Sequence, residues 1–212
     1  MLEGAFGLST GLLYVPGCYA NTEEIIELAR VAGELGGIYI SHMRDEAGGV
    51  LESVRETIQI GERAGVPVQI THHKLIGPRA WGKTHQAYEL IREARARGVD
   101  VTVDQYPYTA SSTGLSVLLP RWALAGGGEA FRKRLADPAQ RKRILAETVD
   151  RLLHDRAGAD LRRVVLASCR SDPDLAGKTL QEALVHRARK PDMTAAAELV
   201  VELEQRGGCT AI

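Results

Sequence analysis

The stretch that decides the fold is Gly37-Ile38-Tyr39-Ile40-Ser41-His42-Met43-Arg44-Asp45-Glu46, an apolar, β-prone run that ends in a histidine and a cluster of charges. A second copy of this pattern, PVQITHHK at residues 67–74, follows after an amphipathic segment. In each copy a hydroxyl residue precedes the histidine, and His42 and His72 are thirty positions apart. Because one strand–helix unit has about this length, we expect the two histidines at the same level on neighbouring parallel strands.

The placement of the two histidines favours a shared metal ion. The carboxyl ends of parallel strands meet at one edge of the sheet, where ligand and catalytic groups collect in α/β folds. Neutral imidazole is a common zinc ligand, and a catalytic zinc takes three protein ligands and leaves one position for water. A lone histidine is more often a hydrogen-bonded residue near a strand end, but the repeated placement reverses that preference. His42 and His72 are therefore candidate zinc ligands and form an incomplete set.

Helical and strand patterns alternate on both sides of this stretch. A glycine-rich run at residues 4–16 predicts a buried strand followed by a loop, and a later strand is predicted at residues 99–103. Apolar residues recur at helical spacing in three segments, at residues 22–35, 50–64 and 84–97. Four strands alternating with three helices predict an α/β fold with a parallel sheet and external helices.

The pattern changes after residue 111. We expect a charge-laced helical stretch, a short strand and two more helices, at residues 129–154, 164–168, 179–188 and 194–206. The chain then closes at residues 207–212, just where another strand is expected to begin. Three segments follow from this pattern: βα units at 1–113, a mainly helical insertion at 114–170 and a helical continuation at 171–212.

Charge and cysteine content exclude several classes of partner. The chain has 212 residues, 27 Lys plus Arg and 27 Asp plus Glu, so no global field recruits nucleic acid or an anionic membrane. The basic residues of the 129–154 stretch alternate with acidic and apolar ones, which favours a solvated helix face. Three scattered cysteines, Cys18, Cys169 and Cys209, predict neither a disulfide framework nor a zinc knuckle. With no membrane-spanning run and no signal peptide, we expect a cytoplasmic protein with a small-molecule partner.

Further polar residues follow the predicted strand ends. Lys74 is two positions beyond His72, so both side chains could face one cavity, where a lysine could hold a carboxylate; a solvated loop lysine is the alternative. Tyr14, Tyr106 and Tyr108 lie at or after strand ends, where a phenol can donate to a substrate oxygen, although each also suits a rim or core position.

Four residues near the histidines have weaker indications. Asp104 could be a metal ligand, a carboxylate that steers a histidine, or a cap, and the three alternatives stay open. We expect Asp45 and Glu46 to pair with their neighbours outside the site. His73 should point away from whatever His72 faces, because adjacent residues of a strand point to opposite sides.

Four motifs occur in order along the first half of the chain. They are GAFGLSTGL with Tyr14 and Pro16, then GIY with SHMRDE, then THHK at 71–74, and then DQYPY at 104–108 with SST at 111–113. Together they resemble the N-acyl-D-amino-acid deacylases, also called D-aminoacylases, of the amidohydrolase superfamily. The resemblance continues weakly through residues 171–179 to the end of the chain.

The resemblance implies a zinc-dependent hydrolase on a TIM barrel, of which this chain is a central fragment that is incomplete at both ends. It implies hydrolysis of the amide bond of N-acyl-D-amino acids to a carboxylate and a D-amino acid. The family's zinc ligands match His42 and His72, and its substrate pocket is lined by positions that match Lys74, Tyr106, Ser112 and Tyr14.

Three family features have no counterpart in this chain: the HxH pair of the first barrel strand, the cysteine ligand, and the catalytic aspartate after the last strand. Cys18 does not replace the cysteine, because it lies in the loop after the Tyr14 motif. We therefore expect no catalytic residue here and little activity from the fragment alone. Two alternatives stay open: a cyclic-amide hydrolase of the dihydroorotase type, and a non-catalytic barrel remnant.

Overall fold

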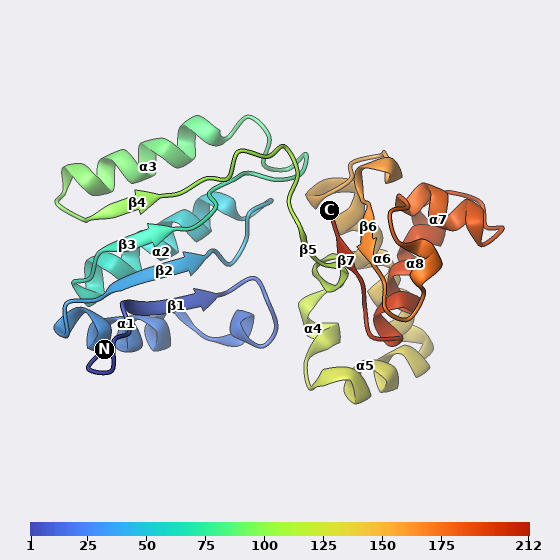
Figure 1. Ribbon diagram of the computed structural model, residues 1–212, viewed down its shortest axis with the longest axis horizontal. Coiled ribbons are helices and arrows are strands. Elements are labelled where there is room, and N and C mark those ends of the chain that lie inside the picture. Colours follow the sequence, from blue (N-terminus) through green and yellow to red (C-terminus); the bar gives the residue numbers. More distant parts are fainter. The chain divides into compact units, whose positions relative to one another are not determined.

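The computed structural model describes residues 1–212 and divides the chain into two compact units (Figure 1). The first unit comprises Met1–Ile76 and Ala80–Pro107, and the second comprises Gly77–Arg79 and Tyr108–Ile212. Each unit has its own apolar core. The division of the chain into three functional segments stays a prediction.

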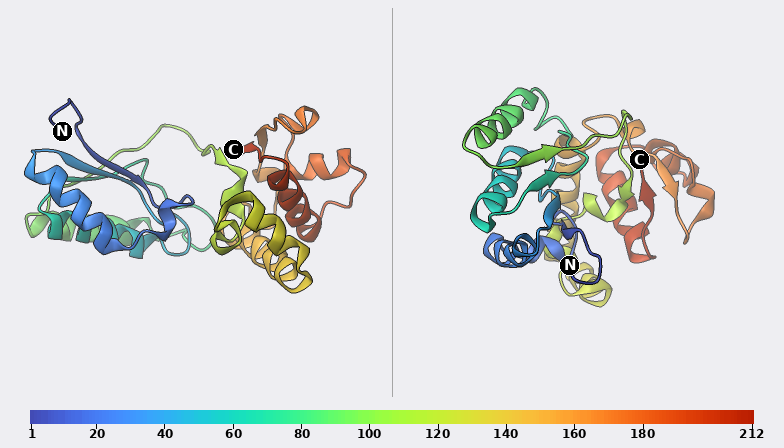
Figure 2. Two further views of the ribbon diagram at one scale, coloured as in Figure 1. Left: turned by 90° about the horizontal axis from the view of Figure 1, so that it is seen from below. Right: turned by 60° about the vertical axis from the view of Figure 1, so that its left-hand side comes forward.

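The first unit alternates strands and helices as predicted. Its main elements are β1 (Gly7–Gly11), α1 (Thr22–Glu34), β2 (Ile38–His42), α2 (Val50–Ala64), β3 (Val68–Ile70), α3 (Thr84–Ala96) and β4 (Val101–Val103), with a short 3-10 helix, η1 (Gly17–Tyr19), after β1. The strands form one parallel sheet in the order β1-β2-β3-β4. The three helices pack along one face of that sheet (Figure 2). The predicted α/β class with parallel strands is confirmed.

Local signals in the sequence explain where these helices begin and end. Asn21 caps α1, because its side chain accepts a hydrogen bond from the Glu24 N–H at 2.9 Å. Gly65 ends α2 in the left-handed region with φ 66°, a conformation in which a side chain would be strained. The core of this unit lies between the helices and the sheet, where Ile26, Val54 and Ile70 are fully buried.

The first strand differs from its prediction in burial. Residues 4–16 were expected to begin with a buried strand, but the residues of β1 are exposed or half-buried. The reason is that β1 is an edge strand, which pairs with β2 alone. Glycine at position 7 lets the backbone of β1 lie close to that of β2. A Cβ on Gly7 would be only 2.0 Å from the Ile38 carbonyl oxygen.

The second unit combines helices with a small antiparallel sheet. Its elements are β5 (Thr113–Gly114), η2 (Leu115–Leu118), α4 (Arg121–Leu124), α5 (Gly127–Ala136), α6 (Pro138–Asp155), η3 (Leu161–Arg163), β6 (Leu166–Ser168), η4 (Pro173–Leu175), α7 (Leu180–His186), α8 (Met193–Gln205) and β7 (Thr210–Ala211). The sheet order is β5-β7-β6, with β7 antiparallel to both neighbours. The strand near the end of the chain, β7, belongs to this antiparallel sheet and not to the parallel sheet of the first unit.

The predicted single helical stretch at 129–154 is instead two helices. The chain breaks at Asp137, which caps α6 by accepting hydrogen bonds from the backbone N–H groups of Ala139 and Gln140. Pro138 occupies the first turn of α6. Aspartate followed by proline is a helix-start signal, so the sequence contained the information for this break.

A disulfide joins Cys169 to Cys209, so the prediction of no disulfide is wrong. The two cysteines are 40 residues apart in sequence, and spacing alone gave no sign of their proximity. The antiparallel register places Ser168 opposite Thr210, which brings the neighbouring cysteines together with their Cα atoms 4.4 Å apart. Cys18 is the one cysteine outside this bond.

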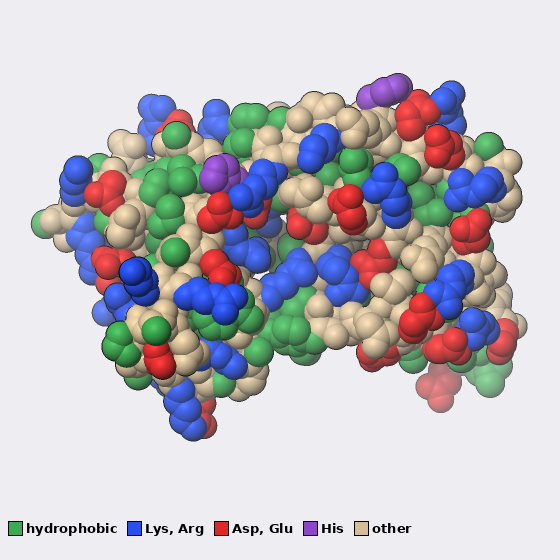
Figure 3. Space-filling model, turned by 180° about the vertical axis from the view of Figure 1, so that it is seen from behind, with side chains coloured by type: hydrophobic (Ala, Val, Ile, Leu, Met, Phe, Trp, Pro, Cys, Tyr) green, Lys and Arg blue, Asp and Glu red, His purple; other side chains and the backbone are tan.

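Charged side chains of both signs are interspersed on the face shown in Figure 3. On the helices of the second unit, Lys133 pairs with Glu129 at 2.8 Å and Arg143 pairs with Glu147 at 2.7 Å. These are exposed pairs at helical spacing, as expected for a solvated helix face. None of the helices is both long and apolar enough to cross a bilayer.

Candidate metal site and substrate pocket

The two predicted histidines lie together at the carboxyl end of the parallel sheet. His42 is the last residue of β2, and His72 lies two residues beyond the end of β3. Their ring centroids are 4.4 Å apart, and the rings meet edge to face at 77°. The side chains of His42 and His72 are 14 % and 26 % exposed, and the Nε2 atom of His42 is buried. Their predicted convergence at adjacent strand ends is confirmed, whereas their role as metal ligands stays a prediction.

Asp104 shapes the turn that carries His72. His72 has a positive φ of 40°, which is unfavourable for a non-glycine residue and needs support from its surroundings. The Asp104 carboxylate gives this support by accepting hydrogen bonds from the His72 backbone N–H at 2.6 Å and the Thr71 hydroxyl at 2.8 Å, and it also contacts the Gln69 amide. Burial raises the pKa of Asp104, but these hydrogen bonds outweigh burial and hold the pKa below its usual value. Of the three open alternatives, these contacts favour a cap of the turn, because the carboxylate accepts from the His72 backbone N–H rather than from its ring.

Glu46 lies inside the site, which corrects the prediction that it pairs with its neighbours outside. It is 3 % exposed, and its Oε1 atom is 3.1 Å from His72 Nδ1 and 2.6 Å from Lys74 Nζ. The same atom is 3.9 Å from His42 Nε2. Glu46 is four residues beyond His42, and the bend of the chain after β2 returns it to the strand end, which sequence spacing did not reveal. Asp45 instead accepts hydrogen bonds from the backbone N–H groups of Ala47 and Gly49.

The electrostatics of Glu46 suit a cation site. Burial raises the pKa of the Glu46 carboxyl, but its contacts with His72 and Lys74 outweigh burial and keep the pKa below its ordinary value. The carboxyl is therefore ionised at neutral pH. One ligand atom from each of His42, Glu46 and His72 can be chosen so that all three lie within 4.8 Å of one another. Two imidazole nitrogens and a carboxylate oxygen are a donor set that zinc accepts.

Three of the four predicted substrate-binding residues surround this group. The Tyr14 ring is 4.8 Å from the His42 ring, and the Tyr106 ring is 6.4 Å from the His72 ring. The Lys74 ammonium lies 5.6 Å from the centre of the Tyr106 ring. Ser112 is exposed and belongs to the second unit, directly before β5, so it is not part of the group that the first unit assembles.

His73 faces the opposite way from His72, and that prediction is confirmed. Its ring is 4 % exposed and meets the ring of Tyr88 on α3, with ring centroids 5.6 Å apart. Burial lowers the pKa of the His73 imidazole below its ordinary value. His73 is therefore a neutral core residue behind the sheet edge.

The chain is similar to a D-aminoacylase over nearly its whole length and to an N-acyl-D-glutamate deacylase over part of it. It is 34 % identical over 207 residues to a D-aminoacylase of Alcaligenes xylosoxydans xylosoxydans, a match that covers 98 % of this chain and 34 % of that protein. An N-acyl-D-glutamate deacylase of the same organism is 44 % identical over 120 residues, which are 57 % of this chain and 24 % of the relative.

A solved structure has the same fold over this region. The crystal structure of N-acyl-D-glutamate deacylase from Bordetella bronchiseptica, complexed with zinc and a phosphonate inhibitor, superposes with a TM-score of 0.70 and 29 % identity. The matched region covers 98 % of this chain and 34 % of the solved chain. The chain thus spans about a third of the length of the D-aminoacylase and of this solved structure.

A weaker match joins the chain to a cyclic-amide hydrolase. A dihydroorotase of Pelotomaculum thermopropionicum is 33 % identical over 129 residues, which are 50 % of this chain and 30 % of the relative. No protein-family model matches the chain.

Proposed function

We propose that this chain, a homologue of the N-acyl-D-amino-acid deacylases, supplies the central part of a zinc-dependent hydrolase that cleaves N-acyl-D-amino acids. The observation that carries the proposal is the convergence of His42, Glu46 and His72 at the end of a parallel sheet, beside Lys74 and two tyrosines. The products would be a carboxylate and a free D-amino acid. The family that the motifs resemble is also the one of the D-aminoacylase, which matches 98 % of the chain, and of the N-acyl-D-glutamate deacylase, which matches 57 %.

The residues of the site divide between metal and substrate. His42 and His72, with the Glu46 carboxylate beside them, would hold a zinc ion, which when bound lowers the pKa of water and polarises an acyl carbonyl. Glu46 also accepts a hydrogen bond from Lys74, so it fixes the lysine next to the histidines. The Glu46 carboxylate and the Lys74 ammonium both face His72 Nδ1, at 3.1 and 2.8 Å, and so hold the imidazole in one orientation, which favours metal binding.

The substrate carboxylate would meet a positive side chain. Lys74 provides the charge, and Tyr106 and Tyr14 provide phenol groups on the two sides of the histidine pair. Binding the carboxylate and the acyl oxygen at fixed places would make the site read the chirality of the substrate, because the two enantiomers then direct their side chains to different places. We keep Ser112 as a fourth substrate-binding residue. No residue of this chain is assigned as the general base, which the rest of a longer protein would supply.

The 212 residues alone should bind zinc weakly, since they hold only part of the family's ligand set. We also keep the predictions of a cytoplasmic location and of no nucleic-acid partner. In a cytoplasmic location the Cys169–Cys209 pair would be held reduced, because disulfides are uncommon in that compartment.

Cyclic-amide hydrolysis is the second candidate, and the dihydroorotase relative is the observation that favours it. A cyclic amide has no free leaving amine, so its hydrolysis gives a single product. Dihydroorotate also carries a carboxylate that Lys74 could bind, so the charge at the site does not separate the two substrates.

A substrate panel on the longer protein that contains this chain tests the proposal. We expect release of free amino acid from N-acetyl-D-amino acids, none from the matched L-enantiomers, and no ring opening of dihydroorotate or hydantoin. Ring opening without deacylation would establish the second candidate. Inactivity on the whole panel in a zinc-loaded preparation would indicate a non-catalytic barrel.

A further inference from the structure

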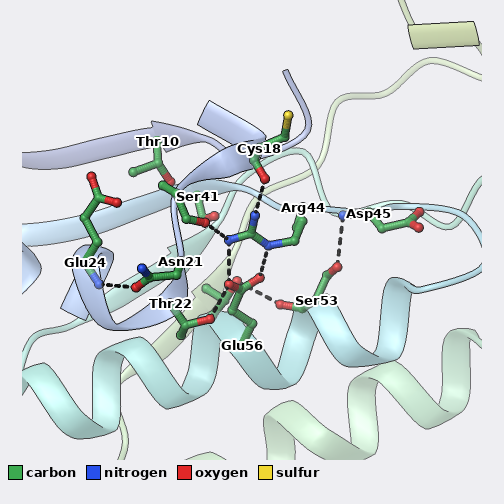
Figure 4. A network of polar contacts seen from close by, with 12 residues as sticks. Thr10, Cys18, Asn21, Thr22, Glu24, Ser41, Arg44, Asp45, Ser53 and Glu56 are labelled. Atoms are coloured by element: carbon green, nitrogen blue, oxygen red, sulfur yellow. Dashed lines mark hydrogen bonds and ion pairs between the residues drawn. The ribbon is translucent and has the colours of Figure 1, made fainter. Parts of the chain in front are cut away.

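The loop that carries Tyr14 is bound by a single arginine, Arg44, which follows β2 (Figure 4). The Arg44 guanidinium donates hydrogen bonds to the carbonyl oxygens of Cys18 at 2.9 Å and Ala20 at 3.0 Å. Both carbonyls belong to the loop between β1 and α1, in and just after η1. One side chain therefore joins the strand end that bears His42 to the far end of the loop.

Arg44 is itself fixed by Glu56 on α2. The Nε and Nη2 atoms donate to the two oxygens of the Glu56 carboxylate at 2.9 and 2.8 Å, which is a bidentate ion pair. The Thr22 hydroxyl of α1 donates to the same carboxylate at 2.7 Å. The side chains of Arg44 and Glu56 are only 23 % and 13 % exposed. A planar guanidinium satisfies the carboxylate and both carbonyls at once, which a lysine ammonium cannot do in this geometry.

The loop is pinned on its other side by the strand ends. The Leu12 N–H donates to the His42 carbonyl at 3.0 Å, and within the loop the Cys18 N–H donates to the Tyr14 carbonyl at 2.8 Å. Gly11 makes room for the Tyr14 ring, since a Cβ there would lie 3.2 Å from a ring carbon. The position of the Tyr14 ring beside His42 thus depends on both attachments of the loop.

We propose that Arg44, oriented by Glu56, is a positioning residue that holds the loop at residues 12–20 so that Tyr14 lies beside the His42 edge of the metal site. The effect of Arg44 on catalysis rests on the proposed function, whereas its hold on the loop does not. Because Tyr14 would bind substrate rather than react, loss of the hold should weaken substrate binding and leave the chemical step and the zinc content unchanged.

The Cys18 thiol reports the state of the loop directly. It is the one cysteine outside the disulfide, it is half-buried, and its own carbonyl accepts the Arg44 hydrogen bond. In the 212-residue chain, Arg44→Gln should raise the rate of Cys18 labelling by an aromatic disulfide reagent about tenfold. The reason is that the loop of the variant opens without breaking the charged hydrogen bonds of Arg44.

Arg63→Gln is the matched control for the labelling experiment. Arg63, which lies on α2, also forms a bidentate pair, with Glu23 of α1, but it does not contact the loop. Its substitution should leave the Cys18 labelling rate unchanged. An unchanged labelling rate in Arg44→Gln would overturn the hold of Arg44 on the loop. An equal rise of the rate in Arg63→Gln, with both variants unfolding at the same urea concentration, would overturn it too.

Kinetics of the longer protein test the catalytic consequence. Arg44→Lys should raise KM for an N-acyl-D-amino acid about tenfold while kcat stays within about twofold and the zinc content is unchanged. Tyr14→Phe should also raise KM, and the double variant should resemble Tyr14→Phe, because Arg44 acts through Tyr14. Additive effects of the two substitutions would contradict this route. If the longer protein hydrolyses no N-acyl-D-amino acid, the proposed function fails and Cys18 labelling alone decides whether Arg44 holds the loop.

Discussion

At the scale of single residues, the structure adds Glu46 to a site that sequence patterns had reduced to two histidines. His42 and His72 could be predicted because each follows a β-prone run, and a parallel sheet brings such ends together. Glu46 could not, because its position depends on how the chain bends after β2 rather than on strand periodicity. Asp104 had three open roles, and only its contacts with Thr71 and His72 favour one of them.

Glu46→Gln tests whether the buried carboxylate supports the metal site. Glutamine keeps the shape of the side chain but removes the negative charge that faces His72 and Lys74. We expect the zinc affinity of the longer protein to fall about 10- to 100-fold, measured by competition with a chelator. Glu52→Gln, an exposed position on α2, is the control and should leave the affinity unchanged. Equal affinities in the two variants would exclude Glu46 from the site.

At the scale of secondary structure, hydrophobic periodicity predicted the first unit better than the second. The first unit alternates four strands with three helices, and each helix buries one apolar face against the sheet. Its apolar residues therefore recur at helical spacing, which the sequence shows. In the second unit β5 and β7 have only two residues each, so they are too short to show a period. The break at Asp137 was missed for another reason: helical spacing continues on both sides of it, while the capping signal is confined to the Asp137–Pro138 pair.

Gly61→Ala tests the close packing of α2 on β3. Alanine usually stabilises a helix relative to glycine by about 0.5–1 kcal/mol. At Gly61, however, a Cβ would lie 2.6 Å from a methyl carbon of Val68, so we expect a loss of about 1–3 kcal/mol in the free energy of unfolding. Gly128→Ala in the first turn of α5 meets only a distant Arg132 side chain at 3.5 Å, so it should be neutral or slightly stabilising. Urea unfolding measures both, and a stabilised Gly61→Ala would show that the helix can move away from the strand.

At the scale of the whole molecule, two cores and one disulfide set the stability of the two units. The disulfide that closes β6 to β7 lies entirely in the second unit. Sequence analysis predicted none, because an odd number of scattered cysteines has no framework spacing. Only the antiparallel register of β6 and β7 brings the two cysteines together. Such long-range pairings are the part of the fold that a single sequence leaves open.

Reduction of the disulfide should therefore weaken the second unit alone. Closing a loop of 40 residues stabilises a fold by about 4 kcal/mol in the chain-entropy account, so a reductant should lower the urea midpoint of this unit. Trp122 lies in the second unit and Trp81 in the first, so the variants Trp81→Phe and Trp122→Phe separate the two transitions by fluorescence. A shift of the Trp81 transition equal to that of Trp122 would show that the units unfold together.

The zinc content of histidine variants of the longer protein tests the central claim most directly. His42→Ala and His72→Ala should each lose bound zinc and turnover, because each removes one imidazole from the group at the sheet edge. His85→Ala, at an exposed position near the start of α3, should keep the zinc content of the unaltered protein. Full zinc content by elemental analysis in both His42→Ala and His72→Ala would contradict the metal site proposed for this chain.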